Sequence, residues 1–194
     1  GYTVIDSHGG NDTVIGGGGR DVVSGGAGDD SLSGSLGEDA LFGEASDDTL
    51  AGGEGDDALD GGSGADQLDG GDHDDALTGG SGLDSLNGGA GNDTLNGVEW
   101  NETAIGGLGT DQASLNLAQA ATGVNLNLSS IWSTGSLAMG LGSLAGVERI
   151  THVTGTALAD QFTLSTTITD AIDIGGGGGN DTLNGGGGGD ALCG

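Results

Sequence analysis

The chain has 194 residues, of which 48 are glycine and 30 are Asp or Glu, and its formal net charge is −28. Two arginines are its only Lys or Arg residues, which excludes a nucleic-acid binder because such a protein needs a basic surface. No apolar run approaches the ~18 residues of a membrane-spanning helix. Abundant glycine without proline or a three-residue period also excludes collagen. A disordered acidic chain and a repeat structure stabilised by cations remain.

An internal repeat of nine residues organises the first part of the chain. Aspartate recurs at every ninth residue, and an aliphatic residue follows two places later, from Val14 to Leu95. Each unit reads G-G-x-G-x-D-x-U-x, where U is aliphatic, and GGAGDDSLS (25–33) is a clean copy. The aspartates are Asp12, Asp21, Asp30, Asp39, Asp48, Asp57, Asp66, Asp75, Asp84 and Asp93, the frame continues with Glu102 and Asp111, and a second block (176–193) adds Asp181 and Asp190.

The unit predicts a short strand followed by a tight turn. The residues x-U-x place U on one face of a strand and its neighbours on the other. The glycines suit a loop that visits positive φ, which is costly for residues with a Cβ atom. Two units then form one coil of 18 residues, and parallel strands stack ~4.8 Å apart. We therefore predict an all-β parallel roll, a form of β-solenoid, with two ladders of Leu and Val inside.

The composition also predicts that the roll needs a cation. One aliphatic residue in nine gives too thin a core to offset the entropy of ordering the chain. Stacked aspartates would in addition repel one another and raise one another's pKa. Carboxylates and loop carbonyls are oxygen ligands, which suit calcium better than magnesium because calcium accepts flexible cages of many oxygens. There is no Cys/His cluster for zinc, since Cys193 is the only cysteine.

The repeats in 7–114 and 176–193 resemble those of the RTX (repeats-in-toxin) family of secreted bacterial proteins. The resemblance implies a right-handed parallel β-roll in which Ca²⁺ lies between successive coils. Loop carbonyls that alternate in direction, together with the aspartate side chain, would hold each ion. The implied ligands are the thirteen repeat aspartates named above, and loop glycines Gly16, Gly17, Gly19, Gly25, Gly26, Gly28, Gly52, Gly53, Gly55, Gly61, Gly62, Gly64, Gly79, Gly80, Gly82, Gly88, Gly89 and Gly91.

The repeat also bounds the number of ions. Six loops on each edge leave five gaps, which predicts up to about ten Ca²⁺ in the main roll. Weak or empty sites are expected where loops depart from the motif, above all at 97–102; these loops are 7–12, 34–39, 43–48, 70–75 and 97–102. The additional acids one place before the motif aspartate are expected to be solvated; they are Asp29, Asp47, Asp56 and Asp74.

The frame divides the chain into three predicted parts. Residues 1–114 form the main β-roll, with twelve units in 7–114 and a leading strand. Residues 115–174 form an irregular β spacer or cap, in which the loop 155–160 lacks the inner glycines and is not expected to bind calcium. Residues 175–194 begin a second, truncated roll. Because the chain starts without Met and ends within a repeat, we expect it to be a segment of a longer protein.

The leading functional hypothesis is a calcium-binding module of a secreted or cell-surface bacterial protein that folds on binding extracellular Ca²⁺. The family resemblance implies type I secretion. Catalytic motifs such as H-E-x-x-H and G-x-S-x-G are absent, so we expect no enzyme activity here and place any catalytic domain outside this segment. The expected partners are calcium ions, neighbouring domains and further copies of the chain, with no nucleic acid and no transmembrane segment.

Two alternative functions remain. The first is a structural component of a surface layer, adhesin or extracellular filament, assembling through Ca²⁺-loaded rolls; self-association in Ca²⁺ would distinguish it from a monomeric module. The second is an ice-binding β-solenoid, which depends on one outward column of mostly hydroxyl side chains: Thr13, Ser31, Thr49, Gln67, Ser85 and Thr103.

Overall fold

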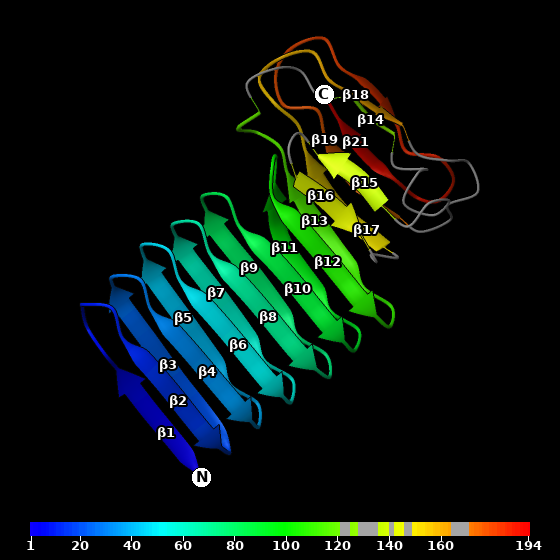
Figure 1. The fold of residues 1–194 in the computed structure, drawn as a ribbon. Coiled ribbons are helices and arrows are strands. Elements are labelled where there is room, and N and C mark those ends of the chain that lie inside the picture. Colours follow the sequence, from blue (N-terminus) through cyan, green and yellow to red (C-terminus); the bar gives the residue numbers. More distant parts are fainter. Residues whose placement is uncertain (121–124, 128–135, 140–141, 146–148, 164–170) are drawn as a thin grey trace.

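A computed structural model describes residues 1–120, 125–127, 136–139, 142–145, 149–163 and 171–194. All regular elements in these ranges are β-strands, and strands β1 to β13 stack in chain order along one roll (Figure 1). The described residues contain no helix with the length and apolar character of a bilayer span. The predicted all-β parallel roll is thereby confirmed.

Two large sheets form opposite walls of the roll. The first contains, in spatial order, β1 (Tyr2–Asp6), β3 (Arg20–Ala27), β5 (Ala40–Ala45), β7 (Ala58–Ser63), β9 (Ala76–Ser81), β11 (Thr94–Glu99), β13 (Gln112–Asn116), β17 (Arg149–Thr154), β19 (Asp173–Gly175) and β21 (Ala191–Cys193). The second contains β15 (Ser136–Met139), β16 (Gly142–Ala145), β12 (Thr103–Leu108), β10 (Ser85–Ala90), β8 (Gln67–Asp72), β6 (Thr49–Glu54), β4 (Ser31–Leu36) and β2 (Thr13–Gly18). Successive strands therefore alternate between the walls through β13.

The strand register confirms that two nonapeptide units make one coil. From β1 to β11 each strand pairs in parallel with the strand two places later, and paired residues differ by 18 up to a shift after Leu95, as in Leu41↔Leu59 and Leu50↔Leu68. The one antiparallel pair among the described strands joins β15 to β16. A third small sheet contains β14 (Asn125–Asn127), β18 (Gln161–Thr163) and β20 (Thr182–Asn184).

The strands are longer than the three residues that the motif suggested. Most main-roll strands have six residues, because the first three loop residues continue to pair with the neighbouring coil. In β7, for example, the pairing extends from Ala58 to Ser63. The turn proper is therefore only the short segment between the end of one strand and the motif aspartate.

The core is a double ladder of aliphatic side chains. Val23, Leu41, Leu59, Leu77 and Leu95 come from the first wall, and Leu32, Leu50, Leu68 and Leu86 from the second; all are at most 2 % exposed. Small residues take the same place further along, at Ala104 and Ala113. Burial of one such side chain in every nine residues fits the thin core that the sequence predicts.

The first wall extends beyond the main roll. It continues from β13 through β17 to β19 and β21, so strands from all three predicted parts share one sheet. The division into three domains stays a prediction. The alternating sequence GVNLNLSS (123–130) predicts a strand in the spacer; its residues 125–127 form β14, and the rest lies outside the described residues.

Candidate metal centres between the coils

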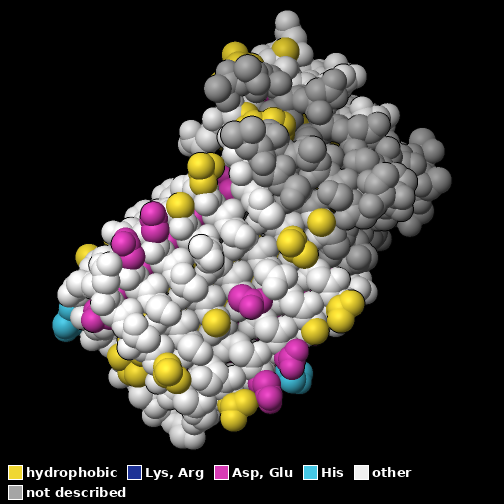
Figure 2. Space-filling model, in the orientation of Figure 1, with side chains coloured by type: hydrophobic (Ala, Val, Ile, Leu, Met, Phe, Trp, Pro, Cys, Tyr) yellow, Lys and Arg dark blue, Asp and Glu magenta, His cyan; other side chains and the backbone are white. Residues whose placement is uncertain are grey.

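The motif aspartates lie immediately before the strands and are buried. From Asp21 to Asp111 their exposed fractions are 0–3 %, and Glu102, which takes the same place, is 2 % exposed. Figure 2 accordingly shows few acidic side chains on the face it draws, mostly near the edges where the loops turn. Burying so many carboxylates is costly unless each one is hydrogen-bonded or bound to a cation.

From Asp30 to Asp93, and again at Asp111, one carboxylate oxygen of each motif aspartate accepts a hydrogen bond from the preceding coil. The amide N–H of Asp39 donates to Oδ1 of Asp57 over 2.7 Å, and that of Asp57 donates to Oδ1 of Asp75 over 2.8 Å. The same bond, at 2.7–2.9 Å, links Asp12 to Asp30, Asp21 to Asp39, Asp30 to Asp48, Asp48 to Asp66, Asp66 to Asp84, Asp75 to Asp93, and Asp93 to Asp111. These nine bonds define nine regular gaps between coils.

The second oxygen has no hydrogen-bond partner. Oδ2 is buried and unsatisfied in Asp12, Asp21, Asp30, Asp39, Asp48, Asp57, Asp66, Asp75, Asp84 and Asp93. An unsatisfied buried acceptor costs about 1–3 kcal/mol, and more when it is charged. A buried oxygen that is left unsatisfied in every one of these loops fits a cation that binds it.

The first glycine of each loop makes room beside this oxygen. A Cβ atom added to Gly34 would lie 2.8 Å from the carbonyl oxygen of Gly52 and would clash with Oδ2 of Asp39. The carboxylate and the carbonyl of the next coil therefore converge on space that only glycine leaves open. The same holds at Gly16, Gly43, Gly52, Gly61, Gly70 and Gly88.

Loop carbonyls reach each gap from both coils. A Cβ atom on Gly53 or Gly55 would collide with the carbonyl oxygens of Ser35 or Gly37, in the preceding coil. Carbonyls at the second and fourth loop places therefore point toward the next coil, whereas the first-place carbonyl, as at Gly52, points back. Each regular gap thus gathers oxygens from two loops, the donor set that calcium prefers.

The carboxylates resist ionisation when no cation is bound. Burial raises the pKa of Asp57 and Asp66 to about 6 and that of Asp75 to about 7. The backbone N–H bond lowers each pKa in part, while the charges of neighbouring aspartates raise it further. A bound cation would reverse this balance by favouring the charged carboxylate.

Four of the five atypical loops keep the regular backbone. At the second and fourth loop places, residues other than glycine adopt positive φ: His8 (68°), Ser35 (83°), Glu44 (79°), Ser46 (88°) and His73 (87°). Gly53 and Gly55 occupy these places with φ of 118° and 131°. Loops 7–12, 34–39, 43–48 and 70–75 therefore retain the regular shape despite their lost glycines.

Loop 97–102 does depart from the pattern. The register with β13 shifts between Leu95 and Val98, and Val98 packs into the core. Oε2 of Glu102 accepts the N–H of Glu99 in its own loop, at 2.7 Å, and Oε1 stays unsatisfied.

Loop 155–160 satisfies its aspartate internally. The N–H of Thr156 donates to Oδ2 of Asp160 over 2.6 Å, and the Thr156 hydroxyl lies 3.0 Å from both carboxylate oxygens. Both side chains are buried. This loop therefore lacks the open carboxylate oxygen of the regular loops, which supports the prediction that it holds no calcium.

The acids one place before the motif aspartate form a second ladder that the sequence analysis missed. Asp47 accepts the N–H of Ala65 at 2.8 Å, and Asp74 accepts that of Asn92 at 2.7 Å. Asp56 accepts the N–H of Asp74 at 3.2 Å. These side chains are exposed, but their hydrogen bonds also connect each loop to the loop of the next coil. Asn92 accepts the N–H of Thr110 through its Oδ1 in the same way. An Asp or Asn one place before the motif aspartate was therefore the sequence signal for this second ladder.

The second block repeats part of this geometry. Oδ1 of Asp181 accepts the N–H of Asp160 at 3.0 Å, and its Oδ2 is unsatisfied. Asp190 accepts the N–H of Ile172 at 3.2 Å. Within the described ranges, no three His, Cys, Asp or Glu side chains gather into a metal site by themselves.

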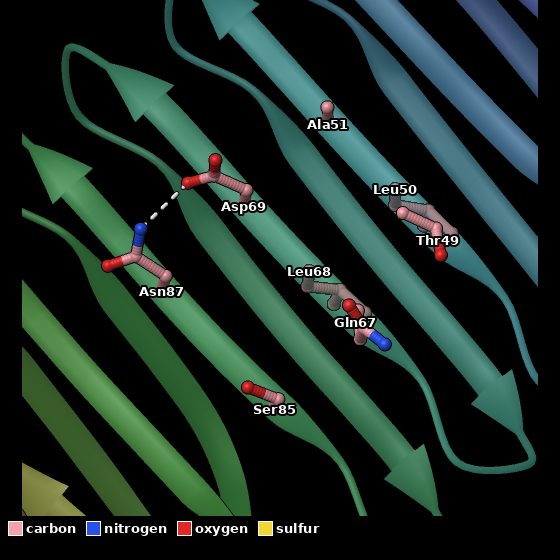
Figure 3. A pocket seen from close by; sticks show the side chains of 8 residues that line it. All are labelled: Thr49, Leu50, Ala51, Gln67, Leu68, Asp69, Ser85 and Asn87. Atoms are coloured by element: carbon pink, nitrogen blue, oxygen red, sulfur yellow. Dashed lines mark hydrogen bonds between the residues drawn. The ribbon is translucent and has the colours of Figure 1, made fainter.

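The outer face of the second wall carries a shallow hollow of about 320 Å³. Figure 3 shows Thr49, Gln67 and Ser85 in one row, while Asn87 donates to Asp69 over 2.9 Å in a second row. The row of hydroxyls is interrupted by the Gln67 amide, and a charged side chain lies beside it.

Comparison with known proteins agrees with this geometry. The family model described as "RTX calcium-binding nonapeptide repeat" matches four copies, at residues 6–41, 33–68, 69–98 and 174–194. Together these matches cover more than half of the chain. None of the curated proteins compared with the chain matches it.

Proposed function

The chain belongs to the RTX calcium-binding nonapeptide-repeat family, and from that premise we propose that its calcium-binding β-roll is a module that folds outside the cell when Ca²⁺ fills the gaps between coils. One observation carries the proposal: a buried carboxylate oxygen without a partner recurs in every regular gap. The repeat itself is structural and not catalytic, and bound calcium would supply the charge neutralisation that the core cannot.

We assign the ions to the nine regular gaps. In each one, Oδ2 of the earlier aspartate would bind the ion; between the loops 52–57 and 70–75 this aspartate is Asp57. Carbonyls of the glycine-rich loops would complete the cage. The four atypical loops with a regular backbone are included, because they keep the aspartate and the carbonyl directions.

Folding and metal binding should be coupled. Nine Ca²⁺ would bring a charge of +18 to a chain of −28, which removes most of the self-repulsion. Extracellular calcium modules bind with Kd values of about 10⁻⁴–10⁻³ M. Such affinities leave the sites empty where free Ca²⁺ is scarce and fill them outside the cell, which suits export of an unfolded chain by type I secretion.

A far-UV circular dichroism titration with CaCl₂, with MgCl₂ as the control, tests this function. A cooperative transition from coil to β-structure with Ca²⁺ alone is expected. Full β-signal in EDTA would contradict the coupling of folding to metal.

Light scattering in the same titration tests a scaffold role in a surface layer, adhesin or filament. We expect a monomeric module, whereas growth of large particles with Ca²⁺ would favour the scaffold. An ice-binding role gains less support, because the column from Thr13 to Thr103 is broken at Gln67.

A further inference from the structure

The gap between loops 79–84 and 97–102 differs from the nine regular gaps. The third family match ends at residue 98, so most of the loop 97–102 lies outside the matched residues. In a regular gap the later carboxylate accepts the N–H of the earlier aspartate. Glu102 instead bonds Glu99 in its own loop, and this leaves Oε1 unsatisfied.

Two open carboxylate oxygens therefore meet in this gap. Oδ2 of Asp84 is buried and unsatisfied, as in the regular loops, and Oε1 of Glu102 is the second open oxygen. Asp84 and Glu102 immediately precede Ser85 and Thr103, which pair in register between β10 and β12, and both side chains are only 2–3 % exposed. Neither group can donate to the other when both are charged, so either a shared proton or a bound cation must offset the repulsion between them.

Building on the proposed function, we infer that Asp84 and Glu102 form a tenth cation site of a different kind, in which two carboxylates bind one divalent, oxygen-seeking ion. The loop 79–84 keeps the regular backbone, with positive φ at Gly80 (106°) and Gly82 (148°). Its second- and fourth-place carbonyls should therefore point into this gap as they do elsewhere. Two carboxylates instead of one should hold the ion more tightly than a regular gap does.

Trp100 provides a local probe. It lies two residues before Glu102, in the same loop, and is partly buried against the core. Tb³⁺ replaces Ca²⁺ at oxygen sites and emits when a nearby tryptophan is excited. In a Trp132→Phe background, which leaves Trp100 as the only tryptophan, we expect Tb³⁺ emission that Ca²⁺ competes away.

The decisive variant is Glu102→Gln, which removes one charged ligand and keeps the side chain's size. Half-maximal Trp100-sensitised emission should then need about tenfold more Tb³⁺. Glu38→Gln, which removes one exposed acid at a loop outside the gap, is the matched control and should leave the titration unchanged. An unchanged titration in Glu102→Gln would overturn the assignment.

Circular dichroism in CaCl₂ separates this proposal from the general one. If the Trp132→Phe chain folds with Ca²⁺ but gives no Trp100-sensitised emission, Asp84 and Glu102 share a proton instead of a cation. This outcome is informative even if the Glu102→Gln variant fails to fold. A chain that folds with neither ion would contradict the proposed function itself.

Discussion

Loops 52–57 and 155–160 both begin with glycine and end with aspartate, but the aspartate carboxylates have different hydrogen-bond partners. In both, a first-place glycine makes room beside a buried aspartate and a carbonyl of the next coil: Gly52 beside Asp57 and Gly70, and Gly155 beside Asp160 and Gly176. Oδ2 of Asp57 has no partner. Oδ2 of Asp160 accepts the N–H and hydroxyl of Thr156.

The second loop place decides this difference. Gly53 (φ 118°) and Ser35 (φ 83°) have positive φ at this place, and the aspartates of their loops keep an open oxygen. Thr156 folds its hydroxyl onto Asp160 and satisfies the carboxylate without a metal. Under the proposed function, a repeat aspartate would bind calcium only where its own loop leaves an oxygen unsatisfied, so the coil that contains Asp160 should not depend on calcium as the regular coils do.

The largest effect expected from this comparison is a dependence on pH. Burial raises the pKa of Asp57 and Asp66 to about 6 and of Asp75 to about 7, so between about pH 4 and 7 the folded chain holds more protons than the unfolded chain. The stability of the metal-free roll should therefore fall as pH rises through this window. Circular dichroism in EDTA should show more β-structure at about pH 5 than at pH 8.

Calcium should reverse this trend, because protons compete with the ion for the same oxygens. The Ca²⁺ concentration at the folding midpoint should be lower at about pH 8 than at pH 5. An EDTA signal that does not change with pH would mean that these carboxylates are not desolvated without metal.

Filling the space beside Asp57 should be the most damaging single substitution. In Gly52→Ala, the new Cβ atom would collide with Oδ2 of Asp57 and the carbonyl of Gly70. We expect a loss of about 3 kcal/mol in the free energy of unfolding at saturating Ca²⁺. Gly18→Ala is the matched control, because a Cβ atom there meets nothing within 4 Å. Thermal unfolding of both variants measures the difference, and equal losses would refute the close approach.

Removing the charge from each aspartate tests the comparison directly. Asp57→Asn should lower the number of bound Ca²⁺ by one and cost about 2 kcal/mol at saturating Ca²⁺. Asp160→Asn weakens bonds from Thr156 and should cost about 1 kcal/mol while leaving the number of ions unchanged. Calorimetric titration counts the ions, and a lost ion in Asp160→Asn would place calcium in loop 155–160 after all.

The sequence could predict the repeating part of this structure because one physical requirement recurs in every unit. The period of nine predicted the register of 18, the walls and the buried ladder from Val23 to Leu95. It also predicted that 155–160 differs, although only the structure shows the reason, which is the hydroxyl of Thr156.

What the sequence could not predict depends on neighbouring coils. The motif predicted weak or empty sites where a glycine is lost, and it could not predict that Ser35, Glu44 and His73 adopt the positive φ of the regular loops in the stacked coils. The hydrogen bond from Asn92 to Asp74 depends on which residues lie 18 places apart. The open oxygen of Glu102 arises because this side chain folds back onto Glu99 in its own loop. Side-chain partners of this kind follow from the stacked loops and not from the composition of one unit.

The smallest expected effect concerns those atypical loops. His73 is exposed and has φ of 87°, a conformation that costs a residue with a Cβ atom about 1–2 kcal/mol. His73→Gly relieves this strain but adds entropy to the unfolded chain, so a net gain of about 0.5 kcal/mol is expected. Ser81→Gly, at an exposed place without positive φ, adds the entropy alone and should destabilise the roll. If the free energy of unfolding at saturating Ca²⁺ rises in His73→Gly and falls in Ser81→Gly, the stacked coils impose the loop shape on His73. If it falls in both variants, the backbone of His73 is not strained, and loop 70–75 differs from loop 52–57 in backbone as well as in sequence.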